Sequence, residues 1–265
     1  MIIAALAVLG LIFGSFLNAM VSRMHAGKDW VRGRSQCDGC GHQLAAKDLV
    51  PLLSWLSLKG RCRYCGQKIS WQHPAIELAT AAAFILSYIF WPASLGLAGQ
   101  KLLLVTWLIS VIGLMALLVY DARWMTLPNR ILYPTFFVAA AGRLAYILGF
   151  ADNKAHSLLF WVFGVLVASG LFWLLFMVSG GRWIGYGDVR LGLVTGTLLA
   201  SPWLSFLMIF IASVLGTLAA LPDLIAGRKG FGSKLPFGPF LITATAIAVL
   251  FGDQIVNWYK SIFLP

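Results

Sequence analysis

The stretch Trp183-Ile184-Gly185-Tyr186-Gly187-Asp188 places an ionisable side chain at the start of an otherwise apolar segment. A carboxylate in such a position is costly, and it usually faces a cavity or a partner instead of lipid. Gly185 and Gly187 remove two Cβ atoms beside it, which allows strained backbone angles and the close approach of another segment. The G-x-G-D pattern alone is equally consistent with a glycine turn and a capping aspartate. A functional interpretation therefore requires a second carboxylate at the same membrane depth.

The composition of the 265-residue chain is that of a membrane protein. It is 60% hydrophobic and 11% charged, with a mean hydropathy of +0.86, whereas soluble domains average about 25% charged residues. A transmembrane helix needs about 20 mostly apolar residues, and the chain holds several such runs. The first, residues 1–22, lacks the basic region of a cleavable signal peptide and is long enough to span. We therefore expect an all-α polytopic membrane protein and exclude a soluble globular domain.

We expect about eight transmembrane helices, with a small extramembrane domain after the first one. The expected helices cover residues 1–22, 75–91, 101–120, 131–149, 157–179, 186–200, 202–222 and 238–258. Residues 23–74 form the inserted domain, and residues 75–265 form the rest of the membrane domain. Segment 186–200 is short and could be a half-span or a tight hairpin with the next helix. Its Gly192 and Gly196 make a G-x-x-x-G pattern that would let a neighbouring helix pack closely.

The positive charges predict the orientation in the membrane. An N-terminus outside the cell puts four connections in the cytoplasm, at residues 23–74, 121–130, 180–190 and 223–237. These connections carry 9, 2, 2 and 3 of the 20 Lys and Arg residues, in agreement with the positive-inside rule. The net charge of +11 is then explained by orientation. We expect the lipid bilayer as a partner and no nucleic acid.

All four cysteines lie in the inserted domain. The pairs Cys37-x-x-Cys40 and Cys62-x-x-Cys65 are separated by 21 residues, close to the spacing of a four-thiolate zinc site. Four thiolates at about 2.3 Å would form a closed, structural site, and a cytoplasmic location disfavours disulfides. Free thiols or a redox pair are the alternatives. The nearby His42 is a possible substitute ligand, but four cysteines already complete the site.

Two of the nine acidic residues stand out. Asp121 ends a helix that runs inward and Asp188 begins one that runs outward, so both are expected at the cytoplasmic face although 67 residues separate them. Glu77 lies in the first turn of the second expected helix, where the helix dipole favours an acid, and we expect a structural role for it. The remaining acids have solvated or capping explanations; they are Asp29, Asp38, Asp48, Asp152, Asp223 and Asp253.

A pair of close carboxylates has a specific chemistry. In a partly dry site the two cannot both ionise easily, so one keeps its proton. The pair then supplies a general base that activates a water against a peptide carbonyl, and a general acid that protonates the leaving amine. A proton or ion pathway also uses membrane-embedded acids. The cytoplasmic position beside a soluble domain favours a peptide substrate.

The ordered set of motifs resembles the type IV prepilin peptidase family. The segments that carry the resemblance are Gly14-Ser15-Phe16-Leu17-Asn18, the two cysteine pairs with Asp48-Leu49-Val50-Pro51-Leu52-Leu53-Ser54-Trp55-Leu56 between them, Pro74-Ala75-Ile76-Glu77-Leu78, Asp121 with Leu127-Pro128-Asn129, Gly185-Tyr186-Gly187-Asp188-Val189-Arg190-Leu191 and Pro236-Phe237-Gly238-Pro239-Phe240. Many members of the family have Asp where this chain has Asn129. An amide cannot act as an acid or a base, so Asn129 is expected to be structural or substrate-facing.

The resemblance implies a bifunctional enzyme of the bacterial cytoplasmic (inner) membrane. It would cleave the basic leader of prepilins or pseudopilins after Gly at the cytoplasmic face, then N-methylate the new terminus with S-adenosylmethionine as the methyl donor. Asp121 and Asp188 would be the catalytic pair, with Gly185, Tyr186 and Gly187 shaping the catalytic loop. The cysteines would hold structural Zn²⁺. No G-x-G-x-x-G motif after a strand marks a binding site for the donor, so those residues stay unknown.

Two other functions fit part of the pattern. An intramembrane aspartyl protease of the presenilin or signal-peptide-peptidase type also combines Tyr-Asp, here Tyr120-Asp121, with G-x-G-D. Such proteases, however, lack a four-cysteine insert after the first helix. A non-catalytic transporter or zinc-dependent membrane scaffold would instead use Asp121 for ion or solute flux and would leave a prepilin uncleaved.

Overall fold

The computed structural model describes residues 1–30, 33–228 and 235–263 of the chain. Within these residues every regular element is a helix, apart from two isolated antiparallel β-bridges. The predicted all-α class is therefore confirmed. The chain divides into two units, residues 1–89 and residues 90–265.

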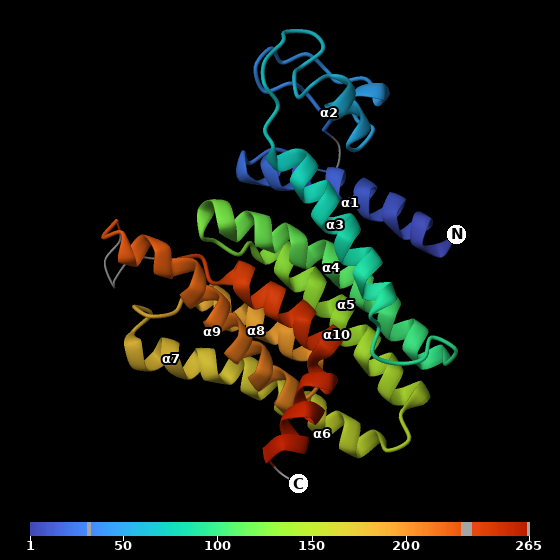
Figure 1. The fold of residues 1–265 in the computed structure, drawn as a ribbon, viewed down its shortest axis with the longest axis vertical. Helices are drawn as coiled ribbons and strands as arrows, with labels where there is room; N and C mark the ends of the chain where they lie inside the picture. Colours follow the sequence, from blue (N-terminus) through green and yellow to red (C-terminus); the bar gives the residue numbers. More distant parts are fainter. Residues whose placement is uncertain (31–32, 229–234, 264–265) are drawn as a thin grey trace. The chain divides into compact units, whose positions relative to one another are not determined.

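The first unit is built on two long helices. Its elements are α1 (Ile2–His25), the 3₁₀ turn η1 (Ala46–Asp48), α2 (Leu53–Ser57) and α3 (Gln72–Ile89). α1 and α3 pack side by side (Figure 1). A Cβ atom on Gly10 would lie 2.5 Å from the Cα of Ala81, and one on Gly14 would lie 2.6 Å from the Cα of Glu77. Two glycines therefore let the backbones of α1 and α3 touch.

Glu77 of α3 supports the loop that precedes the helix. Its buried carboxylate accepts the backbone N–H of Leu52 at 2.8 Å, and Leu52 has a left-handed backbone with φ +58°. The structural role expected for Glu77 is confirmed, but its cause differs. α3 begins at Gln72 and has no acid in its first turn, so Glu77 satisfies a loop amide instead of the helix dipole.

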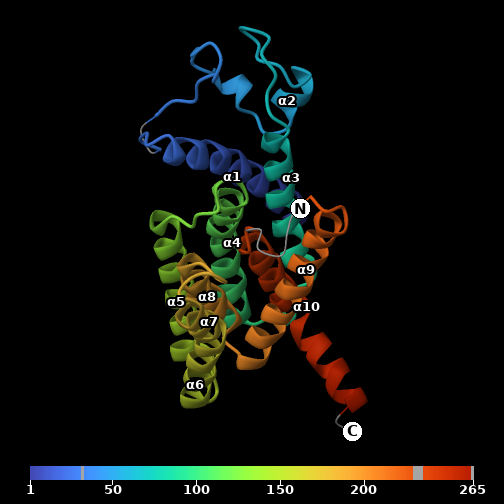
Figure 2. The ribbon, with the colours of Figure 1, turned by 90° about the vertical axis from the view of Figure 1, so that its left-hand side faces the viewer.

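The second unit is a helical bundle around a short central helix. Its elements are α4 (Ala98–Trp124), α5 (Asn129–Phe150), α6 (Lys154–Val165), the π-helical turn η2 (Leu166–Gly170), α7 (Leu171–Ser179), α8 (Tyr186–Leu199), α9 (Pro202–Ile225) and α10 (Gly238–Phe263). α8 packs against α5, α6, α7, α9 and α10 and lies inside the bundle in both views (Figures 1 and 2). Its Leu191, Val194 and Thr195 are fully buried. The helix that carries Asp188 is thus part of the core.

The G-x-x-x-G pattern of α8 faces the π-helical turn, as the sequence predicts for a neighbouring helix. A Cβ on Gly192 would lie 2.8 Å from the carbonyl oxygen of Ala168, and one on Gly196 would lie 2.8 Å from the Cα of Val165. The neighbours in both cases are backbone atoms, which cannot move aside as a flexible side chain can. Glycine therefore sets the distance between α8 and η2.

Six helices are long and apolar enough to cross a membrane among the described residues: α1, α4, α5, the continuous α6–α7 segment, α9 and α10. The other two expected spans, α3 and α8, are 18 and 14 residues long and are not among them. A helix the length of α8 rises ~21 Å, which is short of the ~30 Å hydrocarbon core. Eight full spans are therefore not confirmed. α8 is short and buried, in agreement with the half-span that was one of the two possibilities for residues 186–200.

Substitution of Gly192 by Ala is expected to destabilise the second unit by about 1–3 kcal/mol, because the added methyl overpacks a rigid contact. The measurement is thermal unfolding of the detergent-purified protein. Gly149 is the matched control, since it also lies within a helix but a Cβ there meets nothing within 4 Å. Gly149→Ala should leave stability unchanged or raise it slightly, because Ala favours helix more than Gly does. Equal effects at the two positions would contradict the close packing of α8.

Candidate active site

Asp121 lies in the last turn of α4 and is only 5% exposed. Its Oδ2 accepts the backbone N–H of Gly238, the first residue of α10, at 3.0 Å. The N–H groups at the start of a helix lack partners within the helix and favour a carboxylate. A Cβ on Gly238 would lie 2.6 Å from the same oxygen, so this contact requires glycine. The start of α10 therefore orients the Asp121 carboxylate.

Asp188 lies in the first turn of α8 and is half-buried. Its backbone N–H donates to the carbonyl of Gly185 at 3.1 Å. Gly185 has ordinary extended angles, φ −75° and ψ 148°, and Gly187 is also outside the left-handed region. The strained angles that glycine allows are therefore not adopted at these two positions. Close approach does occur at Gly187, where a Cβ would lie 3.2 Å from Cδ1 of Leu127.

The first turn of α8 is also tied to neighbouring helices by its polar and aromatic side chains. Tyr186 is exposed, and its ring centre lies 5.5 Å from that of Phe176 in α7. The guanidinium of Arg190 lies 5.1 Å from the Tyr186 ring centre, and Arg190 donates a hydrogen bond to Oδ1 of Asn129. Asn129, at the start of α5, thus has a structural partner. These contacts fix the position of the α8 start relative to α5 and α7.

Asp121 and Asp188 lie at the same end of the bundle. Asp121 is held by the start of α10, and the segment around Asp188 touches Leu127, in the connection between α4 and α5. The two carboxyl groups are close enough for their charges to interact. In a buried setting, neighbouring carboxylates favour a state in which they share a proton. The arrangement can supply an acid and a base to one bound group.

Two supporting residues were not identified from the sequence. Gly238 could have been found as a glycine at the start of a helix, in the Pro236–Phe240 motif. Ser169 donates its hydroxyl to the carbonyl of Val189, the residue after Asp188, at 2.9 Å. It carries no visible signal, because a π-helical turn inside an apolar run leaves no distinctive pattern. π-helical turns of this kind occur frequently at functional sites.

The four cysteines of the first unit form a second candidate site. The Sγ atoms of Cys37, Cys40, Cys62 and Cys65 all lie within 4.8 Å of one another. The Sγ atoms of Cys37 and Cys65 are 3.7 Å apart, and all four thiols are free of disulfides. A tetrahedron with metal–sulfur bonds of ~2.3 Å has edges of ~3.8 Å. The cluster therefore has the size and the donor set to hold a metal ion.

Each cysteine pair occupies the turn of a small hairpin. One hairpin is bridged between residues 36 and 43, and the other between residues 61 and 68. Gly41 and Gly66 follow the second cysteine of each pair, at φ +68° and +73°. Each donates its N–H to the carbonyl of the first cysteine at 2.9 Å. The same Cys-x-x-Cys-Gly turn thus occurs twice, and together the two turns present four sulfurs.

Local electrostatics favour a thiolate at Cys37 and hold the second hairpin in place. A hydrogen bond from the backbone of Cys40 is the main cause that lowers the pKa of Cys37 to about 7, and a lowered pKa favours the metal-binding thiolate form. Asp48 accepts Nε–H of Arg63 at 2.7 Å and the hydroxyl of Tyr64 at 3.0 Å. The Arg63 hydrogen bond keeps the pKa of Asp48 below its usual value. Asp48 therefore anchors the turn between Cys62 and Cys65.

Comparison with known proteins gives two family matches along the chain. Residues 8–91 match the bacterial peptidase A24 N-terminal domain, and residues 108–221 match the type IV leader peptidase family. A prepilin leader peptidase/N-methyltransferase of Pseudomonas aeruginosa is 31% identical over 274 residues, covering 95% of this chain and 91% of that protein. One of the same name from Bacillus subtilis is 32% identical over 261 residues, covering 97% of each chain.

No solved structure matches the chain. The two family matches follow each other along the sequence, and the relatives align over nearly their whole length. The segments that carried the resemblance lie inside these matches, apart from residues 236–240, which follow the second match along the chain. The chain therefore belongs to the type IV leader peptidase family.

Proposed function

We propose that this chain is a membrane aspartyl endopeptidase that removes the basic leader of type IV prepilins or pseudopilins after Gly and then N-methylates the new N-terminus. Relatives named prepilin leader peptidase/N-methyltransferase support prepilin processing. The observation that carries the aspartyl mechanism is that Asp121 and Asp188 lie at the same end of the bundle. Cleavage takes place at the cytoplasmic membrane face, where the positive-inside rule puts this end of the helices.

The environment of each aspartate supports a division of labour. Asp121 is the more buried of the two and accepts an N–H from the fixed start of α10, which orients one carboxyl oxygen. Asp188 is half-buried at the edge of the bundle, where water and substrate can reach it. The ionised member of the pair takes a proton from water as it attacks the peptide carbonyl, and the protonated member gives its proton to the leaving amine.

The proposed function is tested with the full chain purified in detergent and a prepilin-like substrate. The substrate carries a basic leader, then Gly, then an apolar helix. We expect a single cut after Gly, followed in the presence of S-adenosylmethionine by a mass gain of one methyl group at the new terminus. If the substrate stays intact under these conditions, the peptidase function is rejected and a transporter or scaffold function is favoured. A cut inside the apolar helix would favour the presenilin-like alternative.

The four thiolates fit structural Zn²⁺. Their number and spacing match a closed tetrahedral site, which leaves no position open for substrate. When bound, the ion supplies a crosslink between the two hairpins. Cys37 and Cys40 hold it from one turn, and Cys62 and Cys65 hold it from the other.

The first unit also holds a cavity of about 430 Å³, to which we assign the methyl donor. Asn18 lines it and donates its amide to the carbonyls of Gly14 and His73, but its Oδ1 is buried without a hydrogen-bond partner among the described residues. A buried acceptor without a donor is costly. The cavity also presents the cations Lys28 and Arg34. S-adenosylmethionine offers both an amino donor and a carboxylate, and when bound it supplies the methyl group.

Asn18→Leu is expected to weaken binding of S-adenosylmethionine about tenfold, the effect of losing one hydrogen bond of about 1.4 kcal/mol. Isothermal titration of the purified protein measures it. The zinc content of the variant serves as the control for folding of the first unit. Equal affinity in a variant with full zinc content would place the donor elsewhere.

A further inference from the structure

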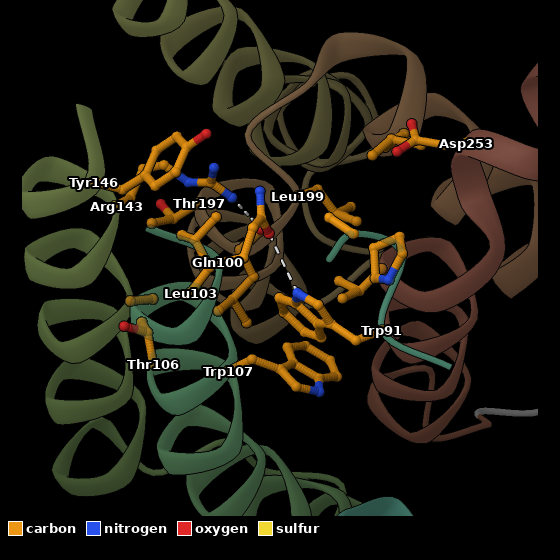
Figure 3. A pocket seen from close by; sticks show the side chains of 16 residues that line it. Trp91, Gln100, Leu103, Thr106, Trp107, Arg143, Tyr146, Thr197, Leu199 and Asp253 are labelled. Atoms are coloured by element: carbon orange, nitrogen blue, oxygen red, sulfur yellow. Dashed lines mark hydrogen bonds between the residues drawn. The ribbon is translucent and has the colours of Figure 1, made fainter. Parts of the chain in front are cut away.

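The second unit contains a polar cavity at the end of the bundle opposite the aspartates. It has a volume of about 250 Å³ and lies where α4 begins and α5 and α8 end (Figure 3). Gln100, in the first turn of α4, lines this cavity. Asp121 follows 21 residues later on the same helix, which is ~32 Å along a straight helix axis. The cavity therefore belongs to a different site.

Two buried polar groups in the wall of the cavity lack partners. Arg143 Nε and Thr197 Oγ1 are both buried without a hydrogen bond among the described residues. The Arg143 guanidinium donates one bond, from Nη2 to the carbonyl of Leu198 at 2.8 Å, and lies 5.9 Å from the ring centre of Tyr146. An unpaired donor on a buried cation is costly unless a ligand or water completes it. These groups point to an acceptor, preferably an anion, inside the cavity.

The cavity has a positive and a negative side. Arg143 is the one cation and Asp253 the one acid among the described residues that line it, and no ion pair joins the two in this part of the chain. Figure 3 shows Arg143 and Thr197 on one side and Asp253 on the other. Asp253 is exposed at the rim. A ligand that carries both an anion and a cation would complement both sides, whereas a simple anion would be repelled by Asp253.

The cavity has an aromatic lining of the kind that is typical of the membrane surface. Trp91 and Trp107 line it, and Trp91 donates Nε1–H to Oε1 of Gln100 at 3.2 Å. Trp and Tyr concentrate where the bilayer meets water, and this end of the bundle is formed by the ends of apolar helices. Zwitterionic lipid headgroups occupy the same depth.

We propose that this cavity binds the headgroup of a zwitterionic phospholipid of the ethanolamine type. The phosphodiester accepts hydrogen bonds from Arg143 and Thr197, and the ammonium group lies beside Asp253. Arg143 also binds the last turn of α8, through Leu198. The lipid therefore contacts the helix whose first turn carries Asp188.

The test measures binding of short-chain lipids to the delipidated full chain by native mass spectrometry and by thermal shift. The probes are dihexanoyl phosphatidylethanolamine, dihexanoyl phosphatidylglycerol, glycerophosphoethanolamine and inorganic phosphate. Wild type should bind the ethanolamine lipid at least tenfold more tightly than the glycerol lipid. Thr197→Val should weaken binding of both lipids, and Arg143→Gln should abolish it. Asp253→Asn should remove the preference for ethanolamine and leave binding of the glycerol lipid equal or tighter.

Lys101→Gln is the matched control, because it removes an exposed cation at the same end of α4 without changing the cavity wall. Loss of lipid binding in Lys101→Gln equal to that in Arg143→Gln would show non-specific attraction and overturn the proposal. An unchanged preference for the ethanolamine lipid in Asp253→Asn would also overturn the proposal. Asp253 is exposed, so this variant tests the proposal even if Arg143→Gln fails to fold. Glycerophosphoethanolamine that binds as tightly as the lipid would overturn the lipid assignment in favour of a soluble phosphodiester.

Discussion

Asp188→Asn should lower the rate of leader cleavage about 10²–10⁴-fold, which is the contribution of a positioned acid or base. Asp121→Asn should lower it by a similar factor. In the proposed mechanism the two groups share one proton and act as one unit, and effects within such a unit are not additive. The double variant should therefore be no slower than the slower single variant. Initial rates on the prepilin-like substrate, at saturating and limiting concentrations, measure all three.

The substitutions are chosen to leave the fold intact. In the wild type, the Asp121 carboxylate accepts the N–H of Gly238 at 3.0 Å. The amide oxygen of Asn at position 121 can still accept this hydrogen bond. Asp152→Asn is the matched control, because Asp152 is an exposed acid between α5 and α6. Near-wild-type cleavage by either single variant, or multiplied losses in the double variant, would rule out the shared-proton pair.

Much of this site could be predicted from local patterns. Asp121 and Asp188 are the acids at the ends of apolar segments, and helices that cross a membrane alternate in direction. The number of helices between the two aspartates therefore predicts that both lie at the same end. Gly192 and Gly196 likewise predict a close neighbour, which the structure identifies as the π-helical turn η2. Each of these predictions needs only spacing and hydropathy.

The remaining features depend on contacts between distant segments. The bond from Gly238 to Asp121 joins residues 117 positions apart. The unpaired atoms Arg143 Nε and Thr197 Oγ1 become informative only when α5 and α8 meet around a cavity. Gly185 shows that a residue type alone does not predict the backbone angles it takes. Glycine permits left-handed angles, but it does not require them, and Gly185 takes ordinary ones. Spacing therefore predicts which residues can approach one another, whereas tertiary packing decides which of them are in contact.

Removal of the metal is expected to unfold the cysteine hairpins. In residues 33–71 only Gly60 and Cys62 are buried, and the regular elements there are η1, with 3 residues, and α2, with 5 residues. Such a segment has almost no apolar core, and domains this small usually depend on a metal or on disulfides. Structural zinc in comparable small domains contributes an apparent ~10–16 kcal/mol. We therefore expect a bound metal to be the main source of order in this part of the chain.

Cys62→Ser should accordingly reduce bound zinc from one equivalent per chain to less than a tenth, and a strong chelator should do the same to the wild type. Limited proteolysis should then cut within residues 33–71, while the second unit resists, because its helices bury their own core. His42→Asn is the matched control: His42 stacks on Tyr64, with ring centres 3.7 Å apart, and lies outside the four-cysteine cluster. It should retain full zinc. Zinc loss in His42→Asn would mean that four thiolates alone do not hold the metal. Protease resistance in metal-free Cys62→Ser would mean that the hairpins fold without the metal.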